Sequence, residues 1–136
     1  MKNDISDLNF AAWQARNNAY APYSDYKVGC VVEQEDGKTF WGANVENSIF
    51  GLTMCAERNA IYKWLLQDGE VLPIKRLVVS FDAALAAPCG ACLQVMLEFM
   101  DPEGEVFAYN GKTSKSWKLK ELLPSSGVIS TLKRRS

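Results

Sequence analysis

The sequence predicts an α/β protein, a layered sandwich in which helices pack on a mixed sheet. Strand patterns alternate with helical patterns after an opening hairpin, an order typical of layered α/β folds. The chain has 136 residues, of which 48% are hydrophobic. That is enough for one packed core and too short for two ordinary domains. We therefore expect residues 1–136 to form a single domain.

The first predicted elements are a helix and a hairpin. Residues 5–20 are expected to be helical because apolar side chains recur at helical spacing, at Ile5, Leu8, Ala12 and Ala15. Residues 26–33 and 39–45 have the composition of strands. Asp36-Gly37 lies between them, a dipeptide that favours a tight hairpin turn.

A second helix is predicted over residues 53–66, which contain good helix formers and apolar residues on one face. Thr53 is a suitable N-cap, which would put Cys55 and Glu57 in the first turns. Gly69 is expected to end this helix.

The remaining elements complete the alternation. Residues 76–81 are a continuous apolar run, as in a central strand. A buried helix is predicted over residues 90–100 and a strand over 105–109. Trp117 is assigned to a short fifth strand, and residues 119–123 to a helical turn.

Charge and hydropathy exclude some classes of function. There are 15 basic and 16 acidic residues, so no electrostatic field favours a nucleic-acid partner. No apolar run approaches the ~20 residues that span a bilayer. The N-terminus is unlike a signal peptide, and we expect a cytoplasmic protein. The basic cluster Lys133-Arg134-Arg135 is interpreted as a solvated tail.

Three cysteines and a glutamate form the pattern that carries chemistry. Cys55, Cys89 and Cys92 lie in two short clusters, and the chain has no histidine. Three thiolates can hold Zn²⁺ and leave a fourth tetrahedral position open, which is typical of a catalytic site. Both clusters fall at predicted helix starts, where the helix dipole favours thiolates. Glu57 is placed to move protons, and Arg58 to donate to a ligand sulfur.

Two further positions indicate a ligand site. Asn44-Val45-Glu46-Asn47 follows the second predicted strand and offers donors and acceptors that suit sugar hydroxyls. Tyr26, at the start of the first predicted strand, could stack on a planar ring. Taken alone, such a tyrosine is more often part of a core.

These motifs together resemble one family, the small zinc-dependent cytidine deaminases of pyrimidine salvage. The resemblance covers nearly the whole chain, in family order and spacing. The matching stretches are Pro22-Tyr23-Ser24-Asp25-Tyr26-Lys27-Val28-Gly29, Asn44-Val45-Glu46-Asn47, Cys55-Ala56-Glu57-Arg58, Pro88-Cys89-Gly90-Ala91-Cys92 and Glu121-Leu122-Leu123-Pro124-Ser125-Ser126.

The resemblance implies a fold, an activity and roles for residues. It implies a three-layer α/β/α sandwich with a mixed five-stranded sheet, a homotetramer, and hydrolysis of cytidine or deoxycytidine to uridine or deoxyuridine and ammonia. Cys55, Cys89 and Cys92 match the zinc ligands, and Glu57 the proton shuttle. The substrate-binding positions are matched by Tyr26 beside the base, Asn44 and Glu46 on the ribose, and the backbone of Ala56 on the pyrimidine edge.

Three positions depart from the family pattern. Leu93 follows Cys92 where the family usually has arginine, so Arg58 would carry more of the charge compensation. Cys30 replaces a common alanine and is interpreted as a core filler. Gly127 stands where an aromatic residue often reaches a neighbouring subunit, and Phe50 is the candidate to compensate.

Three alternatives remain open. Deaminases of modified cytosine nucleosides, such as blasticidin S, share the cysteine signature, although we expect them to lack the Asn-Val-Glu-Asn cluster. A structural zinc module or non-enzymatic binding protein would need a fourth protein ligand. Thiol–disulfide exchange by Cys89 and Cys92 would leave Cys55 and Glu57 without a role.

Overall fold

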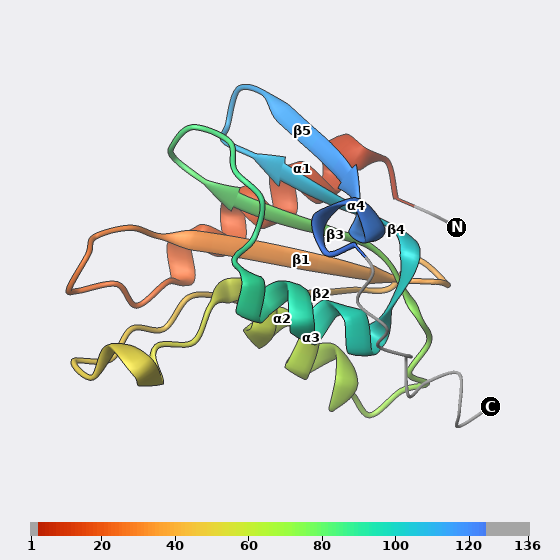
Figure 1. Cartoon of the computed structure of the whole chain (residues 1–136), viewed down its shortest axis with the longest axis horizontal. Coiled ribbons are helices and arrows are strands. Elements are labelled where there is room, and N and C mark those ends of the chain that lie inside the picture. Colours follow the sequence, from red (N-terminus) through yellow and green to blue (C-terminus); the bar gives the residue numbers. More distant parts are fainter. Residues whose placement is uncertain (1–2, 125–136) are drawn as a thin grey trace.

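The computed structural model describes residues 3–124 and confirms the α/β sandwich (Figure 1). None of the helices within this range is long and apolar enough to cross a membrane. In chain order the elements are α1 (Ile5–Ala15), η1 (Arg16–Asn18), β1 (Val28–Gln34), β2 (Thr39–Ala43), η2 (Phe50–Leu52), α2 (Ala56–Leu65), β3 (Ile74–Phe81), α3 (Gly90–Phe99), β4 (Met100–Tyr109), β5 (Ser114–Lys118) and α4 (Leu119–Leu122).

The sheet is mixed and has the order β2-β1-β3-β4-β5. β1 pairs antiparallel with both β2 and β3, and β4 pairs antiparallel with β5. Only β3 and β4 are parallel, because α3 connects them as a crossover. The five predicted strands are therefore all present, including the short fifth one around Trp117.

Each face of the sheet has its own apolar core, so the protein has three layers. Val31 and Val78 point to the face covered by α1, where they pack with Leu8 and Ala12. Their sequence neighbours point to the other face, where the larger core includes residues of α2 and α3. Figure 1 shows α1 on one side of the sheet, with α2 and α3 together on the other. The two helices that carry the thiols consequently share one layer.

The predicted start of the second helix was wrong by three residues. Thr53 does not cap α2, which begins at Ala56 with Cys55 as its N-cap residue. The reason is a tertiary pairing, because Met54 forms an antiparallel bridge with Val45 and so keeps the chain extended. The helix also ends at Leu65, before Gly69. Similarly, the first helix ends at Ala15 and gives way to the short η1.

Two strand glycines allow helices to lie very close to the sheet. A Cβ at Gly29 would stand 2.2 Å from the carbonyl oxygen of Ala12 in α1. A Cβ at Gly42 would stand 2.4 Å from the backbone nitrogen of Ala60 in α2. Both contacts are with backbone atoms, which cannot rotate away. The absent side chains thus set the distance of α1 and α2 from the sheet.

Candidate metal centre and catalytic pocket

Two helix starts bring three thiols together on one face of the sheet. Cys55 is the N-cap residue of α2, Cys89 is the N-cap residue of α3, and Cys92 lies in the first turn of α3. Their sulfur atoms all lie within 4.8 Å of one another. The convergence predicted from the two cysteine motifs is therefore present.

The thiol cluster fits a tetrahedral zinc ion. Sulfur ligands at ~2.3 Å from zinc lie about 3.8 Å apart in a tetrahedron, so small side-chain movements would close the site. Among residues 3–124, no other cysteine, aspartate or glutamate joins this group of ligand atoms. Cys30, a fully buried residue of β1, stays outside it. Three protein ligands would leave one tetrahedral position for water or substrate, as in catalytic zinc sites.

A guanidinium group compensates the charge of the cluster. Nη2 of Arg58 donates a hydrogen bond to Sγ of Cys55 over 3.2 Å. Hydrogen bonding with Cys92 and with Arg58 lowers the pKa of Cys55 to about 5. The pKa of Cys92 is raised because this thiol donates to Cys55 and is buried. A bound cation would favour the thiolate form of the cysteines that hold it.

Glu57 is the second residue of α2 and is buried. Only 6% of the residue is exposed, and it lines the same cavity as Cys55 and Cys89. Burial, followed by the nearby charge of Cys55, raises the pKa of Glu57 to about 7. A carboxyl group in this range can both accept and return a proton near neutral pH. A bound dication would favour its ionised form, which is the form that accepts a proton.

A cavity of about 260 Å³ opens beside the thiols and Glu57. Its volume is near the lower end for ligand pockets, which suits a small molecule. The fully buried Ala56 forms part of its wall. The other wall residues are mostly apolar and include Tyr26, Val28, Val79, Phe81, Ala86 and Pro88. An apolar slot with a few polar groups at one end is suited to a planar ring with polar edges.

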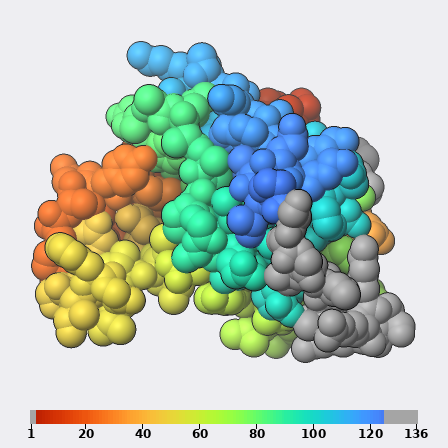
Figure 2. Space-filling view, in the orientation of Figure 1, coloured from red at the N-terminus to blue at the C-terminus, as the bar shows by residue number. Residues whose placement is uncertain are grey.

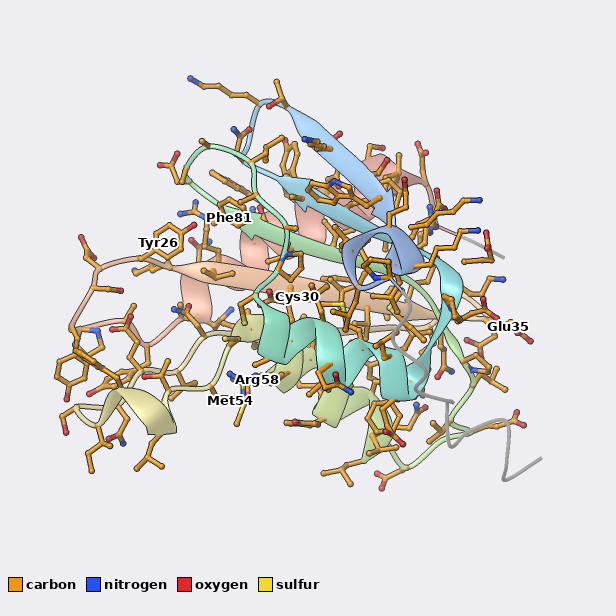
Figure 3. All side chains as sticks on the ribbon, viewed as in Figure 1. Tyr26, Cys30, Glu35, Met54, Arg58 and Phe81 are labelled. Atoms are coloured by element: carbon orange, nitrogen blue, oxygen red, sulfur yellow. The ribbon has the colours of Figure 1, made fainter. Side chains whose placement is uncertain are left out.

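Tyr26 and Phe81 form the aromatic side of this cavity. Their ring centroids are 6.1 Å apart and their planes are inclined by 46°, and Figure 3 shows them as neighbours at the ends of β1 and β3. Burial, followed by the charge of Glu57, raises the pKa of Tyr26, so its hydroxyl stays neutral. Sequence reasoning missed Phe81. Its signal was an aromatic residue at the carboxyl end of a buried strand, the sheet edge where α/β proteins bind ligands.

The two predicted ribose-binding residues have different positions. Asn44 is buried and lines the cavity. Its Oδ1 accepts from the backbone N–H of Val28, and its Nδ2 donates to the carbonyl oxygen of Tyr26. Glu46 is not among the residues that line the cavity. Its carboxylate instead accepts hydrogen bonds from Tyr23 and Ser24.

The three departures from the family pattern have distinct outcomes. Leu93 is buried in the large core, so its side chain contributes apolar packing. Cys30 is buried in the same core, which fits a filler role. Gly127 lies outside the described residues, as does the basic cluster at the C-terminal end.

A larger hollow of about 1000 Å³ lies at the opposite end of the sheet. It is lined by many charged residues and contains the buried ion pair between Glu33 and Arg76. None of its lining residues is a cysteine. The thiols and the perturbed carboxyl group therefore single out the smaller cavity.

Known proteins resemble this chain in sequence and in structure. Residues 2–108 match the family model described as "Cytidine and deoxycytidylate deaminase zinc-binding region". A cytidine deaminase of Sporosarcina psychrophila is 41% identical over 110 residues, which cover 80% of this chain and 79% of that protein. One of Halalkalibacterium halodurans is 41% identical over 99 residues, which cover 73% of this chain and 74% of that protein.

Solved structures match over most of the chain. The crystal structure of cytidine deaminase from Burkholderia pseudomallei superposes with a TM-score of 0.84 at 38% identity. The match covers 90% of this chain and 98% of that one. The crystal structure of cytidine deaminase from Mycobacterium tuberculosis superposes with a TM-score of 0.79 at 31% identity. That match covers 94% of this chain and 100% of the other.

Proposed function

This chain belongs to the family of zinc-dependent cytidine and deoxycytidylate deaminases, and on that premise we propose that it hydrolyses cytidine and deoxycytidine. One water is consumed, the amino group leaves as ammonia, and uridine or deoxyuridine remains. One observation carries the proposal, namely that the buried carboxyl of Glu57 lines one small cavity together with Cys55 and Cys89, two members of the three-thiol cluster. The 136 residues act as one catalytic domain.

Cys55, Cys89 and Cys92 would hold the zinc ion. The metal supplies Lewis acidity, which makes water a usable nucleophile near neutral pH. Arg58 offsets part of the thiolate charge through its hydrogen bond to Cys55, and so preserves that acidity.

Glu57 is the proton carrier of the proposed reaction. Its carboxylate accepts a proton from the attacking water and passes it to N3 of the pyrimidine. It then takes the second proton of that water, from the hydroxyl now attached to C4, and gives it to the amino group, which leaves as ammonia while C4 becomes a carbonyl. Burial raises the pKa of Glu57, which helps its protonated form to donate, and a bound dication would favour the carboxylate that accepts the first proton. Burial in the cavity wall keeps the carboxyl away from bulk water.

The rest of the cavity holds the nucleoside. Tyr26 and Phe81 provide apolar contact for the flat base, and the backbone at Ala56 provides hydrogen-bonding groups for its polar edge. The family resemblance assigns Asn44 and Glu46 to the sugar, and of these two Asn44 lines the cavity. The Asn-Val-Glu-Asn cluster favours ordinary nucleosides over blasticidin S. We place the enzyme in the salvage of pyrimidine nucleosides in the cytoplasm.

The decisive experiment measures ammonia release and zinc content together. Wild-type protein is incubated with cytidine, deoxycytidine and blasticidin S, and the same assays are run on Glu57→Gln. We expect turnover of the first two substrates by the wild type, loss of turnover in the variant by a factor of about 10³ or more, and one zinc per chain in both. Turnover of blasticidin S alone would contradict the substrate assignment. Unchanged activity in the variant would contradict the role of Glu57.

Assembly into a homotetramer is a further part of the proposal. The segment around η2 exposes four large apolar side chains, and the neighbouring turn exposes two tyrosines: Val45, Ile49, Phe50, Leu52, Tyr20 and Tyr23. Phe50 is 81% exposed. Figure 2 shows these segments, in yellow and orange, as one projecting lobe. Contiguous apolar surface of this kind supports burial by another subunit. Light scattering should give four chains per particle, and Phe50→Ser should reduce that number.

A further inference from the structure

Ser24 connects a carboxylate to the backbone of a cavity residue. It lies in the exposed turn between η1 and β1, where Asp25 has a left-handed φ of 58°. The hydroxyl of Ser24 donates a short hydrogen bond to Oε2 of Glu46. The hydroxyl oxygen of Ser24 in turn accepts a hydrogen bond from the backbone N–H of Tyr26 over 3.0 Å. The Ser24 hydroxyl is therefore hydrogen-bonded both to the Glu46 carboxylate and to the Tyr26 backbone, and so links the two residues.

The hydrogen bonds of this turn use almost all the acceptor positions of the Glu46 carboxylate. Its Oε1 accepts from the backbone N–H groups of Tyr23 at 3.0 Å and Ser24 at 3.1 Å. With the Ser24 hydroxyl on Oε2, three of about four acceptor positions of the carboxylate are filled. Hydrogen bonding from the Ser24 hydroxyl also lowers the pKa of Glu46, so the group stays ionised. The carboxylate is thus an anchor for the turn.

Tyr26 is held on both sides of its Cα. Its N–H is bound by Ser24, and its carbonyl oxygen accepts from Nδ2 of Asn44 over 2.9 Å. The ring extends from this fixed backbone to the cavity wall, where Phe81 lies beside it. Nearly half of Tyr26 is exposed, so few other contacts hold the ring in place. The backbone bonds consequently determine where the ring stands.

We propose that Ser24 is a positioning residue for nucleoside binding, which acts by fixing Tyr26 at the cavity through the Glu46–Ser24–Tyr26 link. The inference rests on the proposed deaminase function and extends it to a residue outside the cavity wall. Without the hydroxyl, Glu46 keeps its bonds to the turn but loses its connection to Tyr26. The ring then samples several positions, and ordering it becomes a cost of binding substrate. Zinc, Glu57 and the reacting atoms are untouched.

The test is a double-mutant cycle with a matched control. Ser24→Ala should raise KM for cytidine about tenfold and leave kcat within about twofold, because the lost interaction serves ground state and transition state alike. Ser24→Thr keeps the hydroxyl and should restore KM. In a Tyr26→Ala background, Ser24→Ala should have almost no further effect, since the residue on which it acts is gone. Ser6→Ala removes another exposed serine–carboxylate bond, to Asp4, far from the cavity, and should change nothing.

The outcomes separate this inference from the proposed function. If the wild type does not deaminate cytidine, the proposed function fails. If the wild type is active but Ser24→Ala leaves KM unchanged, or lowers activity equally with and without Tyr26, the positioning role is overturned. A crystal structure of Ser24→Ala gives a readout that needs no turnover. A displaced or disordered Tyr26 ring supports the inference, and an unmoved ring contradicts it.

Discussion

Arg58 donates a hydrogen bond to the sulfur of Cys55, three residues earlier on the same helix. This spacing places a cation one helical turn from the start of α2, beside the thiols. A zinc ion with three thiolate ligands has a net charge of −1. Among the side-chain hydrogen bonds of residues 3–124, the bond from Arg58 is the one that brings a positive charge to this sulfur cluster. The family arginine after Cys92 is replaced by the buried Leu93. Among the side chains that the structure describes, we therefore expect Arg58 to provide the charge compensation.

Replacing Arg58 with glutamine should weaken zinc binding by about 10- to 100-fold, the usual effect of removing a hydrogen-bond partner of a metal ligand. Competition with a chromogenic chelator measures this without any substrate. Arg16→Gln is the matched control, because Arg16 stacks on Trp13, next to α1 on the other face of the sheet. Equal zinc affinity in both variants would count against the role of Arg58.

Phe81→Ala should raise KM for cytidine by at least about tenfold, since it removes one aromatic wall of the cavity. It should also lower the free energy of unfolding by about 3 kcal/mol, because a buried ring is lost. Phe40→Ala removes a ring that is buried in the same core but does not line the cavity. It should lower stability similarly and leave KM unchanged. A similar rise in KM in both variants would mean that Phe81 acts only through stability.

Cys30→Ala should retain one zinc per chain, because Cys30 lies outside the group of converging sulfurs. Its free energy of unfolding should fall by about 1 kcal/mol for the lost buried volume. Metal analysis together with urea unfolding checks both expectations. Cys89→Ala provides the contrast, since removing a ligand should release the metal. Loss of zinc from the Cys30 variant would instead mean a closed, four-thiol site.

Acid should destabilise the protein through Glu33. Burial opposes ionisation of this carboxyl, but hydrogen bonds from Arg76 and Asn3 outweigh it and keep the pKa of Glu33 below its ordinary value of 4.5. Because the folded state favours the ionised form, this stabilisation is present above about pH 4.5. It is lost as the pH falls through the lower pKa of the folded state.

Glu33→Gln should therefore lower the free energy of unfolding by about 2 kcal/mol near neutral pH and flatten its decline in acid. Urea unfolding from about pH 7 to pH 3 measures both effects. Glu103→Gln is the control, because its ion pairs with Lys118 and Lys120 are exposed and contribute little to stability. Parallel pH profiles for wild type and Glu33→Gln would contradict the assignment.

Local patterns predicted the strands and the thiol cluster well, for a physical reason. The burial alternation of β1 and β3 and the position of cysteines at helix starts are determined by near neighbours in the chain. The start of α2 was missed because it depends on the bridge between Val45 and Met54. Phe81 was missed for the same reason, since it depends on its contact with Tyr26 in space, and the proposed role of Ser24 depends on its bond to Glu46, which is distant in sequence.

The close approach at Gly42 links the sheet to the chemistry. The helix that lies against this glycine carries Glu57 and Arg58 and starts at Cys55. A methyl group at residue 42 would push that helix away from the sheet, and Cys55, Glu57 and Arg58 would shift with it relative to the cysteines of α3. The absence of a side chain at Gly42, in the edge strand β2, thus keeps the site residues of α2 aligned with the cysteines of α3. Any redesign that widens the cavity by repacking β2 would have to keep glycine at residue 42.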